Sequence, residues 1–375
     1  MVAGEASGDL HGATLARALV TLEPDLRIIG MGGARMAAAG VRLVQRAERV
    51  AVVGGTEALG RLPALWTAYR TLRRQLRYGR PGVVVLIDFP EFNLRLARAA
   101  RRQGVPVVYF VAPQLWAWRR RRVRAMARDV NRVLAIFPFE VSLYQEAGVP
   151  VEFVGHPVLD VLPALDRNTA RSALANEEET LVGLLPGSRD AEVRRHLPVL
   201  LEAATRIAAR RPRTRFAVPV ASTITVAGVE AAVRASGLPI RVLPGRAYRV
   251  MAAADLLLIA SGTATLEAAC YGTPMAVLYR LSSVSYALAR TLVRGVSHIS
   301  LPNIVAGREI VPEFIQGRAT PDALAGAALG LLEDDVARAA QRAALLEVRA
   351  RLGESGGGLR AARAVLRERD GATGP

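Results

Sequence analysis

Short apolar runs alternate with helical patterns along most of the chain. Most runs lack polar alternation, which predicts strands that are buried on both faces. The expected strands cover 26–29, 83–87, 105–111, 132–136, 151–154, 181–185, 215–220, 239–243 and 256–260. The expected helices cover 10–20, 63–78, 93–103, 119–130, 190–211, 226–236, 264–271 and 322–350. Alternation of strands with helices predicts an α/β fold with parallel sheets.

The strands are too many for one compact sheet, and a break near 157–170 with two prolines separates two similar halves. We expect two doubly wound, Rossmann-like domains that face a cleft. Their expected bounds are 1–158 and 159–320, followed by helices at 321–375.

The first strand is unusual because only Met1, Val2 and Ala3 precede the polar loop at 4–9. A strand usually has about 5–6 residues. We therefore expect either a short strand or a native start further upstream. A native-source mass that matches Met1 would exclude the second alternative.

The composition is that of a globular protein, with 51% hydrophobic and 22% charged residues. The chain contains 50 basic residues, all of them arginine, and has a net charge of +17. Such a charge suggests nucleic acid or a membrane surface as a partner, but coding bias toward arginine would produce it equally.

Several classes of protein are not supported. The single cysteine, Cys270, excludes an internal disulfide, and the four histidines lack the spacing of a metal site. We therefore predict no metal and no cofactor. Neither a signal peptide nor an apolar run of about 18–20 residues is visible. These patterns predict at most a peripheral membrane protein.

Polar or glycine-containing loops follow five of the expected strands, at 4–9, 88–93, 112–118, 185–189 and 260–267. In open α/β sheets, ligands bind beyond the carboxyl ends of the strands. Five such loops at the same sheet edges favour a common site over scattered surface polarity.

Two loops of the second half suit a phosphate. Gly187, Ser188 and Arg189 open the helix at 190–211, where free N–H groups and the guanidinium could bind an anion. Taken alone, this tripeptide is better explained as a glycine turn with a serine cap. The loop Ser261-Gly262-Thr263 repeats the pattern, and Glu267 could accept hydrogen bonds from a ribose. The competing interpretation is a capped helix with a solvent-exposed glutamate. Both loops in one domain suggest a nucleoside-diphosphate sugar.

The first half offers candidate carboxylates. Asp88 follows a buried strand and could act as a general base toward a sugar hydroxyl, or simply cap the next turn. Glu5, Ser7 and Asp9 lie in a glycine-containing loop before a helix, where they could equally form a capping box.

Aromatic residues beside arginines suggest a surface that binds anions. Trp116 and Trp118 precede a run of arginines at 119–124, and Trp66 lies in the basic helix at 63–78. Such segments suit anionic lipid or nucleic acid, although a buried Trp118 with a solvated helix face is the simpler explanation.

The chain resembles the lipid-A-disaccharide synthase family, whose members are glycosyltransferases of the GT-B architecture. The resemblance runs from residue 3 to about 330 and rests on many motifs in one order, which is highly specific. The motifs are AGEASGDLHGA (3–13), GMGGARM (30–36), IDFPEFN (87–93), YFVAPQLWAWR (109–119), FPFE (137–140), FVGHP (153–157), LLPGSRDAE (184–192), ASGTATLE (260–267), PMAVLYR (274–280), SLPNIVAGRE (300–309) and PEFIQ (312–316). The chain departs from the family at 52–59 and at Gln114-Leu115.

The resemblance implies an inverting transfer without a metal. The family moves 2,3-diacylglucosamine from UDP to the 6-hydroxyl of 2,3-diacylglucosamine 1-phosphate, and forms a β-1,6-linked disaccharide. It implies that residues 1–158 take the acceptor and face the membrane, and that 159–320 bind the UDP-sugar. The helices at 321–375 would cross back or be exchanged in a homodimer. The implied location is the cytoplasm, at the inner face of the cytoplasmic membrane.

The resemblance also implies roles for single residues. Asp88 would be the base, with Glu5, Ser7 and Asp9 completing the catalytic group. The implied substrate contacts are Asn93, Asn303, Arg308 and Gln316, with Arg308 at the acceptor phosphate. The implied UDP contacts are Gly187, Ser188, Arg189, Ser261, Gly262, Thr263 and Glu267.

Two alternatives remain at this level. One is another GT-B enzyme, either a UDP-sugar epimerase or a transferase with a different acceptor. The other is a nucleic-acid-binding protein, which only the charge supports, because no helix-turn-helix, zinc or RNP motif accompanies it. We therefore expect no nucleic acid as a partner. Most arginines then reflect coding bias, with a membrane-facing part at 70–77 and 119–124.

Overall fold

The computed structural model describes residues 1–49, 62–112, 120–282 and 298–371. The chain forms two compact units, one made of Met1–Val161 with Leu352–Pro375 and the other of Leu162–Arg351. The expected segment 321–375 is therefore divided, because its last helix belongs to the first unit.

The first unit contains a seven-stranded sheet in the order β3-β2-β1-β4-β5-β6-β7, in which every pairing is parallel. Its strands are β1 (Val2–Ala3), β2 (Ile29–Gly32), β3 (Arg42–Arg46), β4 (Val84–Ile87), β5 (Val107–Phe110), β6 (Arg132–Ala135) and β7 (Val151–Phe153). Its helices are α1 (Ala6–Leu22), α2 (Ala34–Ala38), α3 (Leu62–Gly79), α4 (Pro90–Arg101), α6 (Arg120–Asp129), α7 (Pro138–Glu146), α8 (Val158–Val161) and α18 (Gly357–Gly371), with a 3₁₀ turn at Ala47–Arg49.

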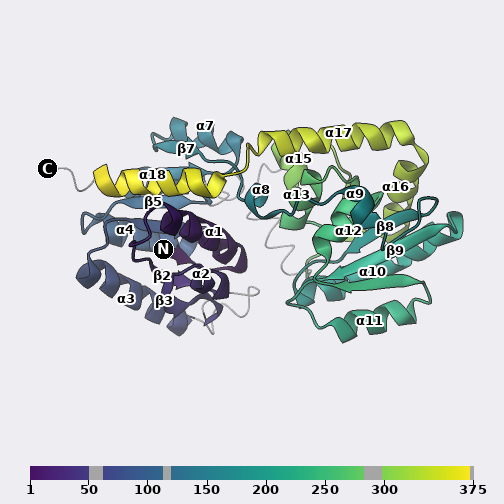
Figure 1. Ribbon diagram of the computed structural model, residues 1–375, viewed down its shortest axis with the longest axis horizontal. Coiled ribbons are helices and arrows are strands. Elements are labelled where there is room, and N and C mark those ends of the chain that lie inside the picture. The colour runs from purple at the N-terminus through teal and green to yellow at the C-terminus, as the bar shows by residue number, and fades with distance from the viewer. Residues whose placement is uncertain (50–61, 113–119, 283–297, 372–375) are drawn as a thin grey trace. The chain divides into compact units, whose positions relative to one another are not determined.

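Helices cover both faces of this sheet. Successive side chains of a strand point to opposite faces, so a strand can contact helices on both sides. Val84 and Leu86 of β4 join a buried cluster with α3, α4 and α6. Ile87 points to the other face, where a Cβ added to Gly12 of α1 would lie 3.1 Å from its Cδ1. Helix α18 packs along α1 (Figure 1).

The second unit repeats the winding with a six-stranded parallel sheet in the order β10-β9-β8-β11-β12-β13. Its strands are β8 (Thr180–Leu185), β9 (Thr214–Val220), β10 (Ile240–Pro244), β11 (Leu256–Ala260), β12 (Met275–Tyr279) and β13 (Glu313–Ile315). Its helices are α9 (Arg167–Arg171), α10 (Asp190–Arg210), α11 (Val226–Ala235), α12 (Ala247–Ala253), α13 (Thr263–Cys270), α15 (Leu301–Ala306), α16 (Pro321–Glu333) and α17 (Asp335–Arg351), with a 3₁₀ turn at Gln316–Arg318.

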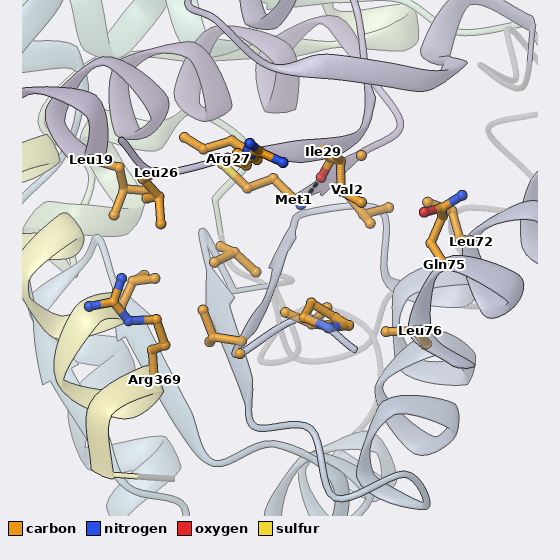
Figure 2. Close-up of a pocket in the computed structure, with 18 of the residues that line it drawn as sticks. Met1, Val2, Leu19, Leu26, Arg27, Ile29, Leu72, Gln75, Leu76 and Arg369 are labelled. Carbon is orange, nitrogen blue, oxygen red and sulfur yellow. Dashed lines mark hydrogen bonds between the residues drawn. The ribbon is translucent and has the colours of Figure 1, made fainter. Parts of the chain in front are cut away.

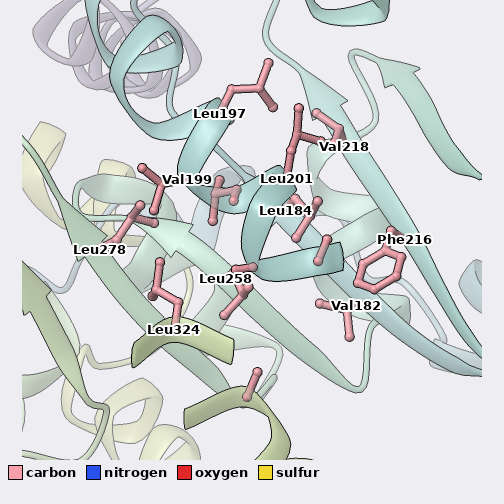
Figure 3. Close-up of a cluster of buried hydrophobic side chains, with 14 of the residues drawn as sticks. Val182, Leu184, Leu197, Val199, Leu201, Phe216, Val218, Leu258, Leu278 and Leu324 are labelled. Atoms are coloured by element: carbon pink, nitrogen blue, oxygen red, sulfur yellow. The ribbon is translucent and has the colours of Figure 1, made fainter. Parts of the chain in front are cut away.

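Apolar side chains on one face of this sheet hold α10, α11 and α16 in place. Figure 3 shows Val182, Leu184, Leu258 and Leu278 of the strands beside Leu197 and Leu201 of α10 and Leu324 of α16. Burial of such side chains contributes about 1.5–3 kcal/mol each before conformational entropy is subtracted. The predicted class, an α/β protein with two doubly wound sheets, is confirmed.

One expected helix is wrong. The pattern at 322–350 forms two helices, because Asp334 adopts an extended backbone and its carboxylate accepts a hydrogen bond from the Ala337 N–H at 2.9 Å. The acidic run Glu333–Asp335 is therefore a helix boundary and not a continuous helix surface.

Candidate functional site

The order of strands places four of the five predicted polar loops, at 4–9, 88–93, 185–189 and 260–267, at the switch points of the two sheets. In each sheet the strand order reverses between two neighbours, β1 and β4 in the first and β8 and β11 in the second. Ala3 lies opposite Ile87, so Gly4 and Asp88 leave the first sheet side by side. Ile259 lies opposite Leu185, so the Gly187 and Ser261 loops leave the second sheet together. Ligands of doubly wound proteins bind at such points.

Asp88 has an uncommon backbone conformation. Its φ is +48° and that of Phe89 is +49°, in the left-handed region that costs free energy for residues with a Cβ. The Phe89 ring lies where a side chain on Gly4 would be, since an added Cβ would come within 2.3 Å of it. The turn therefore requires glycine at position 4.

Two side chains stabilise this turn through the Asp88 carbonyl. The Tyr109 hydroxyl donates a hydrogen bond to it at 2.6 Å, and the Asn93 amide donates to the same oxygen at 2.8 Å. Asn93 is fully buried, and its amide also donates to Ile87 O at 3.2 Å. The structure thus gives Asn93 a role in positioning Asp88, and its role as a substrate contact stays a prediction.

The Asp88 side chain is poised to titrate near neutral pH. Burial, and then the charge of Glu5, raises the pKa of the Asp88 carboxyl to about 6, while the Phe89 N–H favours the charged form. A carboxylate with such a pKa can accept a proton from a hydroxyl group and release it again.

The three polar residues of the first loop have different surroundings. Glu5 is exposed at the N-cap of α1 and makes no side-chain cap, while Ser7 is half-buried in the first turn. Asp9 is buried, and its carboxylate accepts hydrogen bonds from the N–H groups of Gly33 (2.7 Å), Arg35 (3.1 Å) and Met36 (3.0 Å). Asp9 therefore caps α2 and not its own helix.

The structure also brings together two histidines that the sequence leaves far apart. The rings of His11 and His156 lie edge to face, with their centroids 6.1 Å apart. Burial lowers the pKa of His11 to about 4 and that of His156 to about 3, so both are neutral. His11 Nδ1 is buried without a hydrogen-bond partner among the described residues. The motifs LHGA and VGHP contain both residues, but no spacing rule pairs them.

In the second unit, Glu192 occupies the start of α10. Its carboxylate accepts hydrogen bonds from the N–H groups of Ser188 (3.0 Å) and Arg189 (3.3 Å). It also pairs with the exposed Arg189 guanidinium at 2.9 Å. Gly187 has a φ of +117°, and an added Cβ would lie 2.5 Å from Glu192 Oε2. An anion at this loop must therefore share or replace the Glu192 contacts.

The second loop of this unit is more open. Gly262 and Thr263 are exposed at the start of α13, and the Ser261 hydroxyl donates to Ile299 O at 3.0 Å. Glu267 is half-buried one turn later, near the Tyr248 hydroxyl at 3.4 Å, and burial raises its pKa. Of the two loops at this sheet edge, the one at Ser261–Thr263 is therefore more accessible to a ligand than the one at Gly187–Arg189.

The other predicted contacts differ in accessibility. Asn303 is fully buried, and its amide bonds Val311 O, Glu313 and the N–H groups of Ile310 and Val311. Its hydrogen-bonding capacity is thus used within the fold.

Arg308 is exposed, with Glu347 4.0 Å away, and Gln316 accepts a hydrogen bond from the Leu281 N–H at 3.0 Å. The roles of both residues as substrate contacts stay predictions.

A cavity of about 160 Å³ lies at the opposite, amino-end edge of the first sheet (Figure 2). It is lined mainly by apolar residues, among them Leu19, Ile29, Leu72 and Leu76. The polar loops lie at the carboxyl edge, so this cavity does not belong to the candidate site.

Some expectations fall outside the described residues, namely those on Trp116, Trp118, Arg119, Gln114-Leu115, the polar loop at 112–118 beyond Ala112 and the loop at 52–59. Among described residues, no three potential metal ligands lie close enough to hold an ion. No described helix is both long and apolar enough to cross a membrane.

Comparison with known proteins gives concordant matches. A family model described as lipid-A-disaccharide synthetase matches residues 1–361. Lipid-A-disaccharide synthase of Geobacter metallireducens is 44% identical over 368 residues, 98% of this chain and 96% of that protein. The enzyme of the same name from Anaeromyxobacter sp. (strain K) is 45% identical with the same coverage. A solved UDP-GlcNAc 2-epimerase from Neisseria meningitidis, bound to UDP-GlcNAc, has a TM-score of 0.56 at 12% identity over 98% of each chain, which shows a shared fold.

Proposed function

The chain belongs to the lipid-A-disaccharide synthetase family of glycosyltransferases, and on this premise we propose that it joins two acylated glucosamines with inversion. The donor is UDP-2,3-diacylglucosamine and the acceptor is 2,3-diacylglucosamine 1-phosphate. The acceptor 6-hydroxyl attacks the anomeric carbon, the bond from that carbon to UDP breaks, and a β-1,6-linked disaccharide forms.

Asp88 takes the proton from the attacking hydroxyl. The position and the pKa of the Asp88 carboxyl support this role. The carboxyl lies at the switch point, on a strained turn, and its pKa is about 6. At neutral pH most of the group is ionised, and it becomes protonated as the new bond forms. Burial, and then the charge of Glu5, keep the pKa of Asp88 raised. Ser7 lines the acceptor side.

The second unit holds UDP through its two loops. The exposed Arg189 guanidinium and the N-terminal ends of α10 and α13 stabilise the charge of the leaving diphosphate. Ser261, Gly262 and Thr263 provide the more accessible of the two loops, and Glu267 accepts hydrogen bonds from the ribose. When the diphosphate binds, Glu192 gives up its contacts with Ser188 and Arg189.

The acylated substrates lie in a membrane, and α3 offers a surface that suits one. Leu62, Trp66 and Tyr78 are 56%, 60% and 72% exposed on this helix. Four arginines, at positions 70, 73, 74 and 77, are exposed beside them. Apolar side chains with arginines bind an anionic bilayer surface. We place the protein at the inner face of the cytoplasmic membrane, as a peripheral enzyme that also forms a homodimer.

The experiment that tests this function measures UDP release from UDP-2,3-diacylglucosamine with and without the lipid acceptor. Release that depends on the acceptor supports the transferase. Release without any acceptor, or an isomerised UDP-sugar in place of UDP, would instead support an epimerase or another member of the fold.

A further inference from the structure

His196 is a buried polar residue whose two ring nitrogens both bond to loop backbone. It lies in the second turn of α10 and is fully buried. Its Nδ1 is 2.8 Å from Pro186 O, and its Nε2 is 3.0 Å from the Arg280 backbone nitrogen. A carbonyl only accepts and a backbone N–H only donates, so the ring is neutral with its proton on Nδ1.

These two partners lie at the carboxyl edge of the second sheet. Pro186 follows β8 and directly precedes Gly187, while Arg280 follows β12. In the sheet, β8 and β12 flank β11, which leads into Ser261 and Gly262. The ring therefore connects the loops on either side of the β11 loop.

The connection continues beyond Arg280. The Leu281 N–H donates to Gln316 Oε1 at 3.0 Å, and Gln316 Nε2 lies 3.4 Å from Leu281 O. A series of hydrogen bonds thus runs from Pro186 through His196 to the end of β13. None of these bonds belongs to a helix or sheet ladder, so their effect is to fix loops.

The surroundings of His196 keep the ring neutral. Burial lowers its pKa, against the opposing effects of the Pro186 carbonyl and the Glu192 carboxylate. Arg195 adds a like charge, and the Tyr279 ring lies 6.0 Å away by centroid. A buried polar ring is costly unless both of its nitrogens are bonded, as they are here.

We propose that His196 is a positioning residue for the donor nucleotide, which holds the Gly187–Arg189 loop in register with the end of β12. This inference rests on the proposed function, because it takes that loop as the diphosphate site. A loop that is ordered before UDP binds loses little conformational entropy on binding. The same order keeps its N–H groups in place to stabilise the leaving diphosphate.

Three substitutions separate the two hydrogen bonds. His196→Leu removes both, His196→Asn keeps a donor near the Nδ1 position for Pro186, and His196→Gln keeps an acceptor near the Nε2 position for Arg280. The matched control is Thr273→Val, since Thr273 is buried before β12, at its other end, and its hydroxyl donates to Met251 O at 2.6 Å. Its loss removes a buried hydrogen bond far from the loop.

The measurements are the Kd of UDP by titration calorimetry, kcat and KM for the UDP-sugar, and thermal unfolding. We expect His196→Leu to weaken UDP binding about tenfold, a factor that the loss of such bonds can produce. His196→Asn should recover most of this loss and His196→Gln less. Thr273→Val should lower the Tm but leave the Kd within about twofold of wild type.

The outcomes separate this inference from the function on which it rests. Wild-type protein that binds no UDP would overturn both. If the wild type binds UDP and folded His196→Leu binds it with the same Kd, only the positioning role is contradicted. If His196→Leu does not fold, the Asn and Gln variants decide: wild-type affinity in both contradicts the proposal, and a graded loss supports it.

Discussion

At Asp88, both the backbone and the side chain are held in states that cost free energy. The backbone is left-handed, and the carboxyl is half-buried near Glu5, which disfavours its charged form. Asn93 and Tyr109 hold the turn against this cost through the Asp88 carbonyl. A fold retains such strain where the surrounding structure over-determines it, and functional sites are the usual place.

Replacement of Asp88 by asparagine should separate activity from stability. Loss of a positioned base lowers turnover by about 10²–10⁴-fold. The folded state holds the Asp88 proton more tightly than the unfolded chain between pH 3.8 and about 6. The wild type therefore loses stability as pH rises through this window.

Asp88→Asn lacks that charge, so above pH 6 it should be more stable than wild type by about 1–3 kcal/mol. Denaturant unfolding at pH 7.5 beside activity assays measures both effects. A variant that keeps wild-type turnover would exclude Asp88 as the base.

The charge of Glu5 should be visible in the pH dependence of the reaction. Because ionised Asp88 is the active form, kcat/KM should fall as pH drops through about 6. Glu5→Gln removes the like charge, so the midpoint of this fall should move to lower pH. A midpoint that stays at the wild-type value would show that burial alone sets the pKa of Asp88.

Among the residues of the site, the sequence could reveal those that follow a strand. Asp88, Gly187 and Ser261 were found because each follows a buried apolar run. The pairing of His11 with His156 depends on the fold, which joins positions far apart in the chain. The role of His196 was also hidden, because its partners are backbone atoms of two loops.

At the scale of elements, two aspartates cap the starts of helices. Asp9 of α1 accepts hydrogen bonds at the start of α2, and Asp334 caps α17 and so separates it from α16. Patterns of apolar residues predicted the long helices and central strands. They missed shorter elements of three to nine residues, namely β3, β12, β13, α2, α7, α8, α9, α12 and α15.

Asp9→Ala should destabilise the first unit. The substitution leaves three backbone N–H groups at the start of α2 without their acceptor, at a cost of about 2–4 kcal/mol. Chemical unfolding monitored by circular dichroism measures this cost. Asp25→Ala removes the same charge from an exposed position and serves as the control. If Asp9→Ala loses turnover at wild-type stability, Asp9 acts on the substrate and not on the fold.

For the whole molecule, the net charge of +17 comes from the arginines that no carboxylate offsets. Many arginines pair with nearby carboxylates, such as Arg369 with Glu23 and Arg171 with Asp255. The arginines of α3 instead surround exposed apolar side chains. In the proposed function, these arginines of α3 contact the membrane surface.

Vesicle binding should depend on α3. Leu62→Ser with Trp66→Ser should weaken binding to vesicles that contain anionic lipid, and replacing Arg73 and Arg77 by glutamine should reduce its salt dependence. Each arginine should contribute about fivefold in affinity, or about 1 kcal/mol. Val336→Ser is the control, because Val336 is 80% exposed on α17. Equal binding by all variants would exclude α3 as the contact.

The most direct test of the account is the product itself. Purified protein is incubated with UDP-2,3-diacylglucosamine and 2,3-diacylglucosamine 1-phosphate beside Asp88→Asn, and the lipids are followed by mass spectrometry. We predict a tetraacyl disaccharide phosphate from the wild type, with its formation at least about 10²-fold slower in the variant. Folded wild-type protein that forms no disaccharide would contradict the proposed transfer, and an Asp88→Asn variant that forms it equally fast would contradict the role of Asp88 as the base.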